Sequence, residues 1–240
     1  MMAVEEKIKS KFDEMIDAGA HFGYSRSRRN PKMSSFIFTA RNNTEIFDLE
    51  KTKNKLDAAK DFLKSLSKDK KTVLFVGTKK ETKEIIESFA KEINMPYITE
   101  RWLGGILTNF VEIKGRIDFL NGLLEKKSSG ELEKHTKKER VLIERDIAKL
   151  ERYLKGVQKI KELPSALVVI DSNEEKIAVS EAKQMNIPLV ALMNSDCDPE
   201  DADYPIPAND NSLSSIKYFM AEIIGAYKEG EAIGEVEPTQ

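Results

Sequence analysis

The residues in this chain best suited to binding chemistry are cations gathered near its amino terminus. Positions 21 to 41 contain no aspartate or glutamate but five cationic side chains, Arg26, Arg28, Arg29, Lys32 and Arg41. The guanidinium fork of arginine matches the oxygens of a phosphate group. Flat side chains such as His21 and Tyr24 can stack on bases or bind ribose hydroxyls. The segment therefore predicts a phosphate-binding surface suited to folded RNA, with an ordinary solvated surface as the alternative.

Two later segments carry a second set of candidate residues. Residues 76–80 (VGTKK) follow an apolar run, and their backbone amides, with Lys79 and Lys80, could hold a phosphate group. The segment has a single glycine and matches neither the dinucleotide fingerprint nor the P-loop, so a nucleotide-binding enzyme is only a rival interpretation. Arg101, Trp102 and Asn109 form the rest of the set, and a core position for Trp102 is an equal alternative.

No arrangement of residues indicates catalysis, a metal site or a cofactor. Asp171 ends an apolar run, where some enzymes place an acid, but the sequence Asp-Ser-Asn favours a local turn. The acidic residues 196–203 lack the glycine and glutamate spacing of a calcium-binding loop and are expected to form a solvated surface. Cys197 has no histidine near it in the sequence, and His21 has no partner for base catalysis. We therefore expect a protein that is not an enzyme.

Composition narrows the class of protein further. The chain has 240 residues, of which 40% are hydrophobic and 33% charged, which is enough apolar material for a core beneath a highly charged surface. No apolar stretch is long enough for a bilayer, and one cysteine fits a reducing, cytoplasmic compartment. Residues 194–240 carry two cations and eleven acids, a net charge of −9 that leaves +7 on the remainder. A basic head and an acidic tail indicate two kinds of partner.

Short apolar runs alternate with helical periodicity along most of the chain. Strands are expected at residues 36–39, 46–49, 72–76, 97–99, 166–170 and 189–193, the first two joined as a hairpin by Asn42 and Asn43. Helices are expected around residues 56–66, 85–93, 173–185 and 212–227, with Asn173 and Ser212 as N-caps. Strands alternating with helices predict an α/β fold with a parallel sheet covered on both faces.

Residues 112–162 do not follow this alternation of strands and helices. Ile113, Ile117, Leu120 and Leu124 form one heptad seam and Ile143, Ile147, Leu150, Leu154 and Val157 another, with Ser-Ser-Gly at 128–130 between them. The pattern predicts an inserted antiparallel coiled-coil helical hairpin that projects from the sheet domain. An ordinary pair of packed helices fits the pattern equally well.

Several ordered motifs together resemble the bacterial small-subunit ribosomal protein two family. They run in sequence from about residue 8 to 227, and the quoted segments are 17–23 (DAGAHFG), 30–33 (NPKM), 36–39 (FIFT), 48–52 (DLEKT), 76–80 (VGTKK), 101–105 (RWLGG), 107–110 (LTNF), 169–171 (VID), 175–178 (EKIA), 186–188 (NIP), 196–199 (DCDP) and 204–210 (YPIPAND). The family usually has histidine where Tyr24 stands and tryptophan where Arg29 stands.

The resemblance implies a flavodoxin- or Rossmann-like sheet domain bearing a coiled-coil hairpin. It further implies a structural, ribosome-bound protein that binds small-subunit rRNA near the junction of head and body and helps to dock ribosomal protein one beside other ribosomal proteins. The periodicity of the chain and its acidic last residues, together with this resemblance, lead us to expect a discontinuous sheet domain (1–111 and 163–230), a hairpin insertion (112–162) and a disordered acidic tail (231–240). The candidate RNA-binding residues are His21, Tyr24, Arg26, Arg28, Arg29, Asn30, Lys32, Arg41, Lys79, Lys80, Arg101, Trp102 and Asn109. A protein–protein adaptor that uses the hairpin for recognition remains a second rival.

Overall fold

A five-stranded parallel sheet forms the centre of the molecule in the computed structural model, which describes residues 11–134 and 136–236. Its strands are β4 (Val73–Val76), β5 (Tyr97–Ile98), β6 (Ala166–Ile170), β7 (Leu189–Met193) and β8 (Tyr204–Pro207). They lie in the order β5-β4-β6-β7-β8, and every neighbouring pair is parallel. In chain order this is 2-1-3-4-5, the arrangement of flavodoxin-like sheets. The predicted α/β class with a parallel sheet is thus confirmed.

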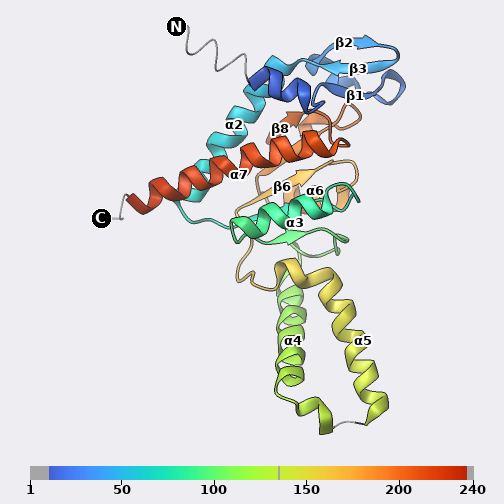
Figure 1. The fold of residues 1–240 in the computed structure, drawn as a ribbon, viewed down its shortest axis with the longest axis vertical. Coiled ribbons are helices and arrows are strands. Elements are labelled where there is room, and N and C mark those ends of the chain that lie inside the picture. Colours follow the sequence, from blue (N-terminus) through green and yellow to red (C-terminus); the bar gives the residue numbers. More distant parts are fainter. Residues whose placement is uncertain (1–10, 135, 237–240) are drawn as a thin grey trace.

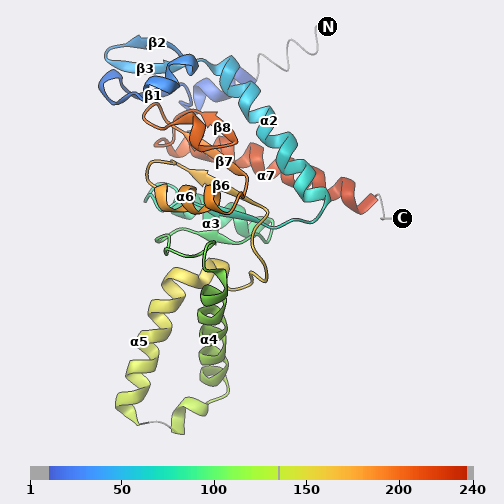
Figure 2. The same cartoon turned by 180° about the vertical axis from the view of Figure 1, so that it is seen from behind.

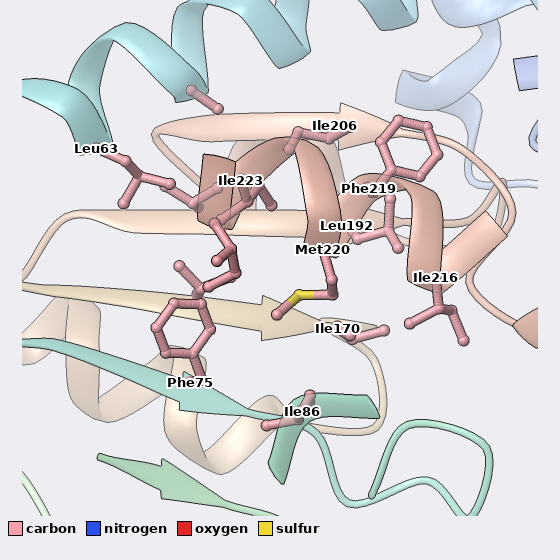
Figure 3. Packing of buried hydrophobic residues seen from close by; sticks show 14 of the residues in the cluster. Leu63, Phe75, Ile86, Ile170, Leu192, Ile206, Ile216, Phe219, Met220 and Ile223 are labelled. Carbon is pink, nitrogen blue, oxygen red and sulfur yellow. The ribbon is translucent and has the colours of Figure 1, made fainter. Parts of the chain in front are cut away.

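Helices cover both faces of this sheet. Side chains alternate between the two faces along each strand, so they contribute to two separate hydrophobic cores. The helices are α2 (Leu49–Lys68), α3 (Lys83–Glu92), α6 (Lys176–Gln184) and α7 (Leu213–Val236). Side chains of α2, α3 and α7 pack on one face of the sheet with Phe75, Ile170 and Leu192 (Figure 3). Side chains of α6 pack on the other face with Leu74 and Val169. Complete burial of β4, β6 and β7 explains why their sequences are continuously apolar.

A second, smaller sheet precedes the large one in the chain. It consists of β1 (Phe22–Ser25), β2 (Ile37–Arg41) and β3 (Thr44–Phe47) in the antiparallel order β1-β3-β2, with the 3-10 helices η1 (Arg26–Arg28) and η2 (Pro31–Phe36) between β1 and β2. Asn42 and Asn43 both have left-handed φ angles, 50° and 62°, as a two-residue hairpin turn requires. The predicted hairpin is therefore confirmed, whereas β1 and β8 were not predicted.

Two long helices extend from the end of the sheet domain opposite the small sheet (Figures 1 and 2). They are α4 (Phe110–Ser128) and α5 (Lys137–Leu154), connected through η3 (Glu131–Lys134), and η4 (Lys155–Val157) leads back from α5. Ile113, Ile117 and Leu120 of the first predicted seam are buried, as are Ile147 and Leu154 of the second. These side chains belong to the same apolar cluster as the α6 face of the sheet, so the arm is anchored at its base. Coiled-coil packing along its length stays a prediction.

The helix ends differ from expectation at two places. Asn173 is not an N-cap, because α6 begins at Lys176 and Asn173 lies in a turn held by Asp171. Helix α7 begins directly after Ser212 but continues to Val236, so residues 231–236 are helical where an acidic disordered tail was expected. Gly230 and Gly234 explain the extension: a Cβ atom at either would press on the backbone of α2, so their absence lets the two helices cross closely. Residues 237–240 of the predicted tail lie outside the described residues.

No helix among the described residues is both long and apolar enough to cross a bilayer.

Candidate nucleic-acid interface

The small sheet is attached to the carboxyl end of the large one, where the connecting loops of the parallel strands gather. The Tyr24 backbone N–H donates to Asn194 Oδ1 at 3.1 Å and to Ser195 Oγ at 2.9 Å, and the Asn30 N–H donates to the Ser195 carbonyl at 2.8 Å. A Cβ atom at Gly23 would lie 3.2 Å from Ser195 Oγ, so a residue without a side chain suits this close approach. The predicted basic segment is therefore mounted on the loop that follows β7.

Side chains alternate between the two faces of the small sheet. On β3, Glu45 and Phe47 are buried, whereas Thr44 and Ile46 on the opposite face are partly exposed. Ser25, Thr44 and Arg41 stand in one row across the three strands, since Thr44 is the register partner of both other residues. This row marks one end of the sheet, beside the Asn42–Asn43 turn.

Three of the predicted cations belong to segments at or next to that end of the sheet. Arg41 stands in the row itself, and the Arg26 N–H donates to the Asn43 carbonyl at 3.2 Å. Arg28 follows in the same 3-10 helix, with its guanidinium carbon 5.2 Å from the centre of the Tyr24 ring. All three side chains are exposed, and none forms an ion pair with an acid in the described part of the chain. They therefore offer uncompensated positive charge.

Arg29 and Lys32, in contrast, are neutralised from within the protein. Arg29 Nη1 lies 3.1 Å from Oε1 of Glu45, whose side chain is completely buried. Neither carboxylate oxygen of Glu45 makes a hydrogen bond to the described residues, so the contact is chiefly one of charge with charge. Lys32 Nζ lies 2.8 Å from Asp198 Oδ2 and also pairs with Glu200, and the hydrogen bond from Lys32 lowers the pKa of Asp198.

The polar and aromatic members of the segment have mainly structural contacts. Asn30 caps η2, its side chain accepting the Lys32 N–H at 3.0 Å. The Tyr24 hydroxyl donates to Asn211 Oδ1 at 3.1 Å. The His21 ring lies 4.0 Å from the Phe22 ring, centre to centre, and burial lowers the pKa of His21. Burial thus favours the neutral form of the His21 ring over its charged form.

Lys79 proves to be the centre of a buried ionic cluster. Its ammonium lies 2.5 Å from Asp171 Oδ2, after β6, and 3.1 Å from Asp210 Oδ2, after β8. The side-chain amide of Asn194, after β7, donates to Asp210 Oδ1 at 2.7 Å. Because Asn194 also accepts the backbone N–H of Tyr24, it links the ionic cluster to the small sheet. Burial lowers the pKa of Lys79, but the charges of Asp210 and Asp171 outweigh it and hold that pKa above its ordinary value. Neighbouring Lys80 is exposed and forms no ion pair with any described acid.

A carboxylate occupies the place where the glycine loop after β4 could have held a phosphate. The Thr78 N–H donates to Glu175 Oε1 at 2.6 Å, and burial raises the pKa of Glu175 despite that hydrogen bond. A Cβ atom at Gly77 would overlap Ile86, which explains the glycine through packing and not through ligand access. With Lys79 and Asp171 beside it, the crevice between β4 and β6 is filled by internal charges. This is the crevice where a flavodoxin-like sheet binds a nucleotide.

A second carboxylate fills the loop after β5. Glu181 accepts hydrogen bonds from Trp102 Nε1–H at 3.0 Å, from the backbone N–H groups of Gly105 (2.7 Å), Leu107 (3.0 Å) and Thr108 (3.2 Å), and from the Thr108 hydroxyl (3.2 Å). Burial raises the pKa of Glu181, but these bonds outweigh burial and lower it overall. Trp102 is only 4% exposed, which favours the core position that the sequence left open as an alternative to RNA binding: its ring packs in the core and its N–H holds the loop.

Arg101 and Asn109 lie at the other edge of the large sheet. Both are exposed, in the connection between β5 and α4. Strands β5 and β8 are the two edges of the five-stranded sheet, which at ~4.8 Å per strand places them roughly 19 Å apart. The candidate residues therefore share the carboxyl end of the sheet but form two groups, one at the small sheet and one at the base of the arm.

Other groups with potential chemistry are occupied structurally. Asp171 Oδ1 accepts the N–H groups of Asn173 (2.9 Å) and Glu174 (3.2 Å), so the predicted turn is confirmed. Cys197 is buried, and burial raises the pKa of its thiol, which makes it a poor nucleophile. The acidic loop is less solvated than expected, because it pairs with Lys32 and Lys183. Within residues 11–134 and 136–236 no cluster of three or more potential metal ligands occurs.

These features define an α/β protein built on a flavodoxin-like sheet, with its nucleotide crevice closed by its own side chains and a cationic surface on an added small sheet. In a comparison with known proteins, the sequence model of the family described as Ribosomal protein S2 matches residues 15–230. The chain belongs to this family, whose members are structural components of the ribosome and not enzymes.

Curated relatives cover most of the chain. The protein named small ribosomal subunit protein uS2 from Wolinella succinogenes is 44% identical over 92% of this chain and 81% of its own length. The proteins of the same name from Nocardia farcinica and Dictyoglomus thermophilum are 44% and 43% identical, over 90% and 93% of this chain and 76% and 91% of their own lengths.

Proposed function

We propose that this protein is a structural constituent of the small ribosomal subunit that binds small-subunit rRNA through the cationic end of its small sheet. The observation that carries the proposal is that Arg26, Arg28 and Arg41 belong to segments at or next to one end of the small sheet and are exposed with no acidic partner among the described residues. Each arginine neutralises phosphate groups and releases their counterions, which makes binding strongly dependent on salt. Such contacts fix position on the RNA without reading its sequence.

The remaining candidate residues divide by role in this proposal. Lys80, Arg101 and Asn109 are exposed and supply further contacts to the RNA backbone. Arg29, Lys32, Asn30 and Lys79 hold the loops in position through their internal partners, and Trp102 is part of the core. Tyr24 and His21 stay candidates for contacts with ribose or base at the edge of the small sheet. The parallel sheet serves as a rigid mount.

The finer assignments rest on the family resemblance together with the shape of the molecule. We propose that residues 1–111 and 163–230 form one discontinuous sheet domain, that residues 112–162 form an inserted coiled-coil hairpin, and that the protein acts on cytoplasmic ribosomes. A position near the junction of head and body would let one surface meet rRNA while others meet neighbouring proteins. The acidic carboxy-terminal region, net −9 from residue 194 onward, is the candidate surface for docking ribosomal protein one.

The salt dependence of binding to purified small-subunit rRNA tests the proposal. Substituting Arg26, Arg28 and Arg41 together by Gln should weaken binding and reduce the slope of log affinity against log salt concentration by about 2 to 3. A matched control replaces Lys68, Lys70 and Lys71 by Gln, since these three exposed cations lie just before β4, at the amino end of the sheet. Equal slopes for the arginine variant and the unmodified protein would refute the proposed surface.

A further inference from the structure

The outer face of the small sheet bears a hollow that phosphate binding does not explain. It has a volume of about 370 Å³ and is lined by His21, Phe22, Arg41, Asn42, Thr44 and Ile46. That volume falls within the ordinary range of small-ligand sites. The hollow lies on the face opposite Glu45 and Phe47, away from the large sheet.

The floor of the hollow is apolar and aromatic. Phe22 and Ile46 are register partners on β1 and β3, so their side chains stand beside each other. Phe22 is 47% exposed, unusual for a large aromatic side chain held in a sheet, and His21 packs against its ring at 40°. An exposed ring on a β-sheet is the means by which several RNA-binding folds stack unpaired bases.

The rim of the hollow is polar and positive. Arg41 and Thr44 are register partners on β2 and β3, and Asn42 follows in the exposed hairpin turn. A guanidinium can stack on a base or hold its phosphate, while hydroxyl and amide groups can hydrogen-bond to a base edge. Arg26 and Arg28 adjoin the same end of the sheet, which gives a strand of RNA leaving the hollow a cationic path.

We propose that this hollow holds one unpaired base of bound RNA, stacked on the ring of Phe22 beside the guanidinium of Arg41. The inference rests on the proposed RNA-binding function and adds to it a non-electrostatic contact. It also moves the stacking role to Phe22, because Phe22 lines the hollow, whereas Tyr24 does not and its hydroxyl is bonded to Asn211. The charge around the hollow favours RNA over a protein side chain, since Glu45, the one acid of the small sheet, faces the other way.

Fluorescence of a base analogue tests the inference with the full chain. The probe is a single-stranded octaribonucleotide of uridines containing one 2-aminopurine, whose emission falls when it stacks on an aromatic ring. The unmodified protein should quench this emission. Phe22→Leu should abolish the quenching and weaken binding about 5- to 100-fold, the range expected for one stacked base, without changing the salt slope.

Two further variants make the result specific. Phe22→Tyr keeps the ring and should retain both quenching and affinity, which separates loss of stacking from loss of folding. Phe38→Leu is the matched control, because Phe38 is 75% exposed on β2 but does not line the hollow. An equal loss of quenching in Phe38→Leu, or full quenching in Phe22→Leu, would overturn the inference.

The two proposals fail in distinguishable ways. In one outcome, the salt slope of rRNA binding depends on Arg26, Arg28 and Arg41, but Phe22→Leu binds as tightly as the unmodified protein. That outcome would refute only the base site. If the slope did not depend on those arginines, the proposed surface itself would be wrong.

Discussion

The ammonium of Lys79 lies 2.5 Å from a carboxylate oxygen of Asp171, at the point where the carboxyl ends of β4 and β6 meet. This is the crevice in which a flavodoxin-like sheet accepts a nucleotide. Here a buried ion pair occupies it, and Asp210 and Asn194 extend the pair to β8 and β7. The fold keeps the architecture of a nucleotide-binding domain but uses the crevice to fix four loops, one of which carries the small sheet.

The first prediction concerns that ionic cluster. Lys79→Met leaves Asp171 and Asp210 buried without their cation and should lower the free energy of unfolding by about 3–5 kcal/mol at pH 7.5. Without Lys79 the pKa of both carboxyl groups in the folded state rises above its value in the unfolded chain. Protonation of the two carboxyl groups at lower pH therefore reduces the energetic cost of burying them. The loss in free energy of unfolding caused by Lys79→Met should accordingly be smaller at pH 5 than at pH 7.5. Already in the unmodified protein, burial and the charge of Asp171 raise the pKa of Asp210 to about 6.

Urea denaturation at the two pH values measures this effect. Lys80→Met is the matched control, since the neighbouring lysine is exposed and should change stability by no more than about 0.5 kcal/mol. A deficit of the same size at pH 7.5 and pH 5 would contradict the assignment of the cost to buried carboxylates.

A second prediction uses Trp102, the single tryptophan of the chain, as a built-in reporter. Because its ring is buried and its N–H is bonded to Glu181, saturating rRNA should leave its emission spectrum unchanged. Glu181→Ala removes the acceptor of three backbone N–H groups, so it should shift the emission to longer wavelength and destabilise the protein by about 3 kcal/mol. Strong quenching of the unmodified protein by rRNA would instead mean that Trp102 contacts the RNA.

A third prediction concerns Arg29 and Glu45. Arg29→Met leaves the buried Glu45 carboxylate without its countercharge and should cost about 2 kcal/mol of stability, less than a fully buried pair because Arg29 is 30% exposed. The double variant Arg29→Met, Glu45→Met should recover to within about 1 kcal/mol of the unmodified protein. Thermal unfolding of the two single variants and the double variant tests this prediction. If the stability lost in the double variant equalled the sum of the two single losses, the two side chains would not interact.

A fourth prediction contrasts two glycines of α7. At Gly230 a Cβ atom would overlap the Lys64 carbonyl of α2, so Gly230→Ala should force the helices apart and cost about 1–3 kcal/mol. At Gly225 a Cβ atom meets no other group, so Gly225→Ala should stabilise the same helix by about 0.5–1 kcal/mol. Changes of equal sign in calorimetric melting temperature would contradict the close crossing of α2 and α7.

The central strands were predictable from sequence, whereas β8 and β1, each at an edge of its sheet, were not. Strands β6 and β7 have the bounds expected, because each is buried on both faces and therefore reads as one continuous apolar run. Strand β8 has the sequence Tyr-Pro-Ile-Pro, and its two prolines are tolerated because it lies at the edge of the sheet. Strand β1 contains Gly23 and is short, and tertiary contacts with Asn194 and Ser195 hold it in place.

The candidate site was predictable only as a segment rich in cationic side chains. Its composition identified the arginines, but partners distant in the sequence decide which of the cations remain available. Lys79 meets Asp210 across 131 positions, and Lys32 meets Asp198 across 166. Phe22 was missed because its role depends on which face of a short strand it occupies, and the sequence did not reveal that strand.

The measurement that tests the account most directly is a density map of assembled small ribosomal subunits containing this protein. We predict that the guanidinium groups of Arg26, Arg28 and Arg41 lie within hydrogen-bonding distance of rRNA phosphate oxygens. A map in which that end of the small sheet faced solvent, with no nucleotide beside it, would contradict the account.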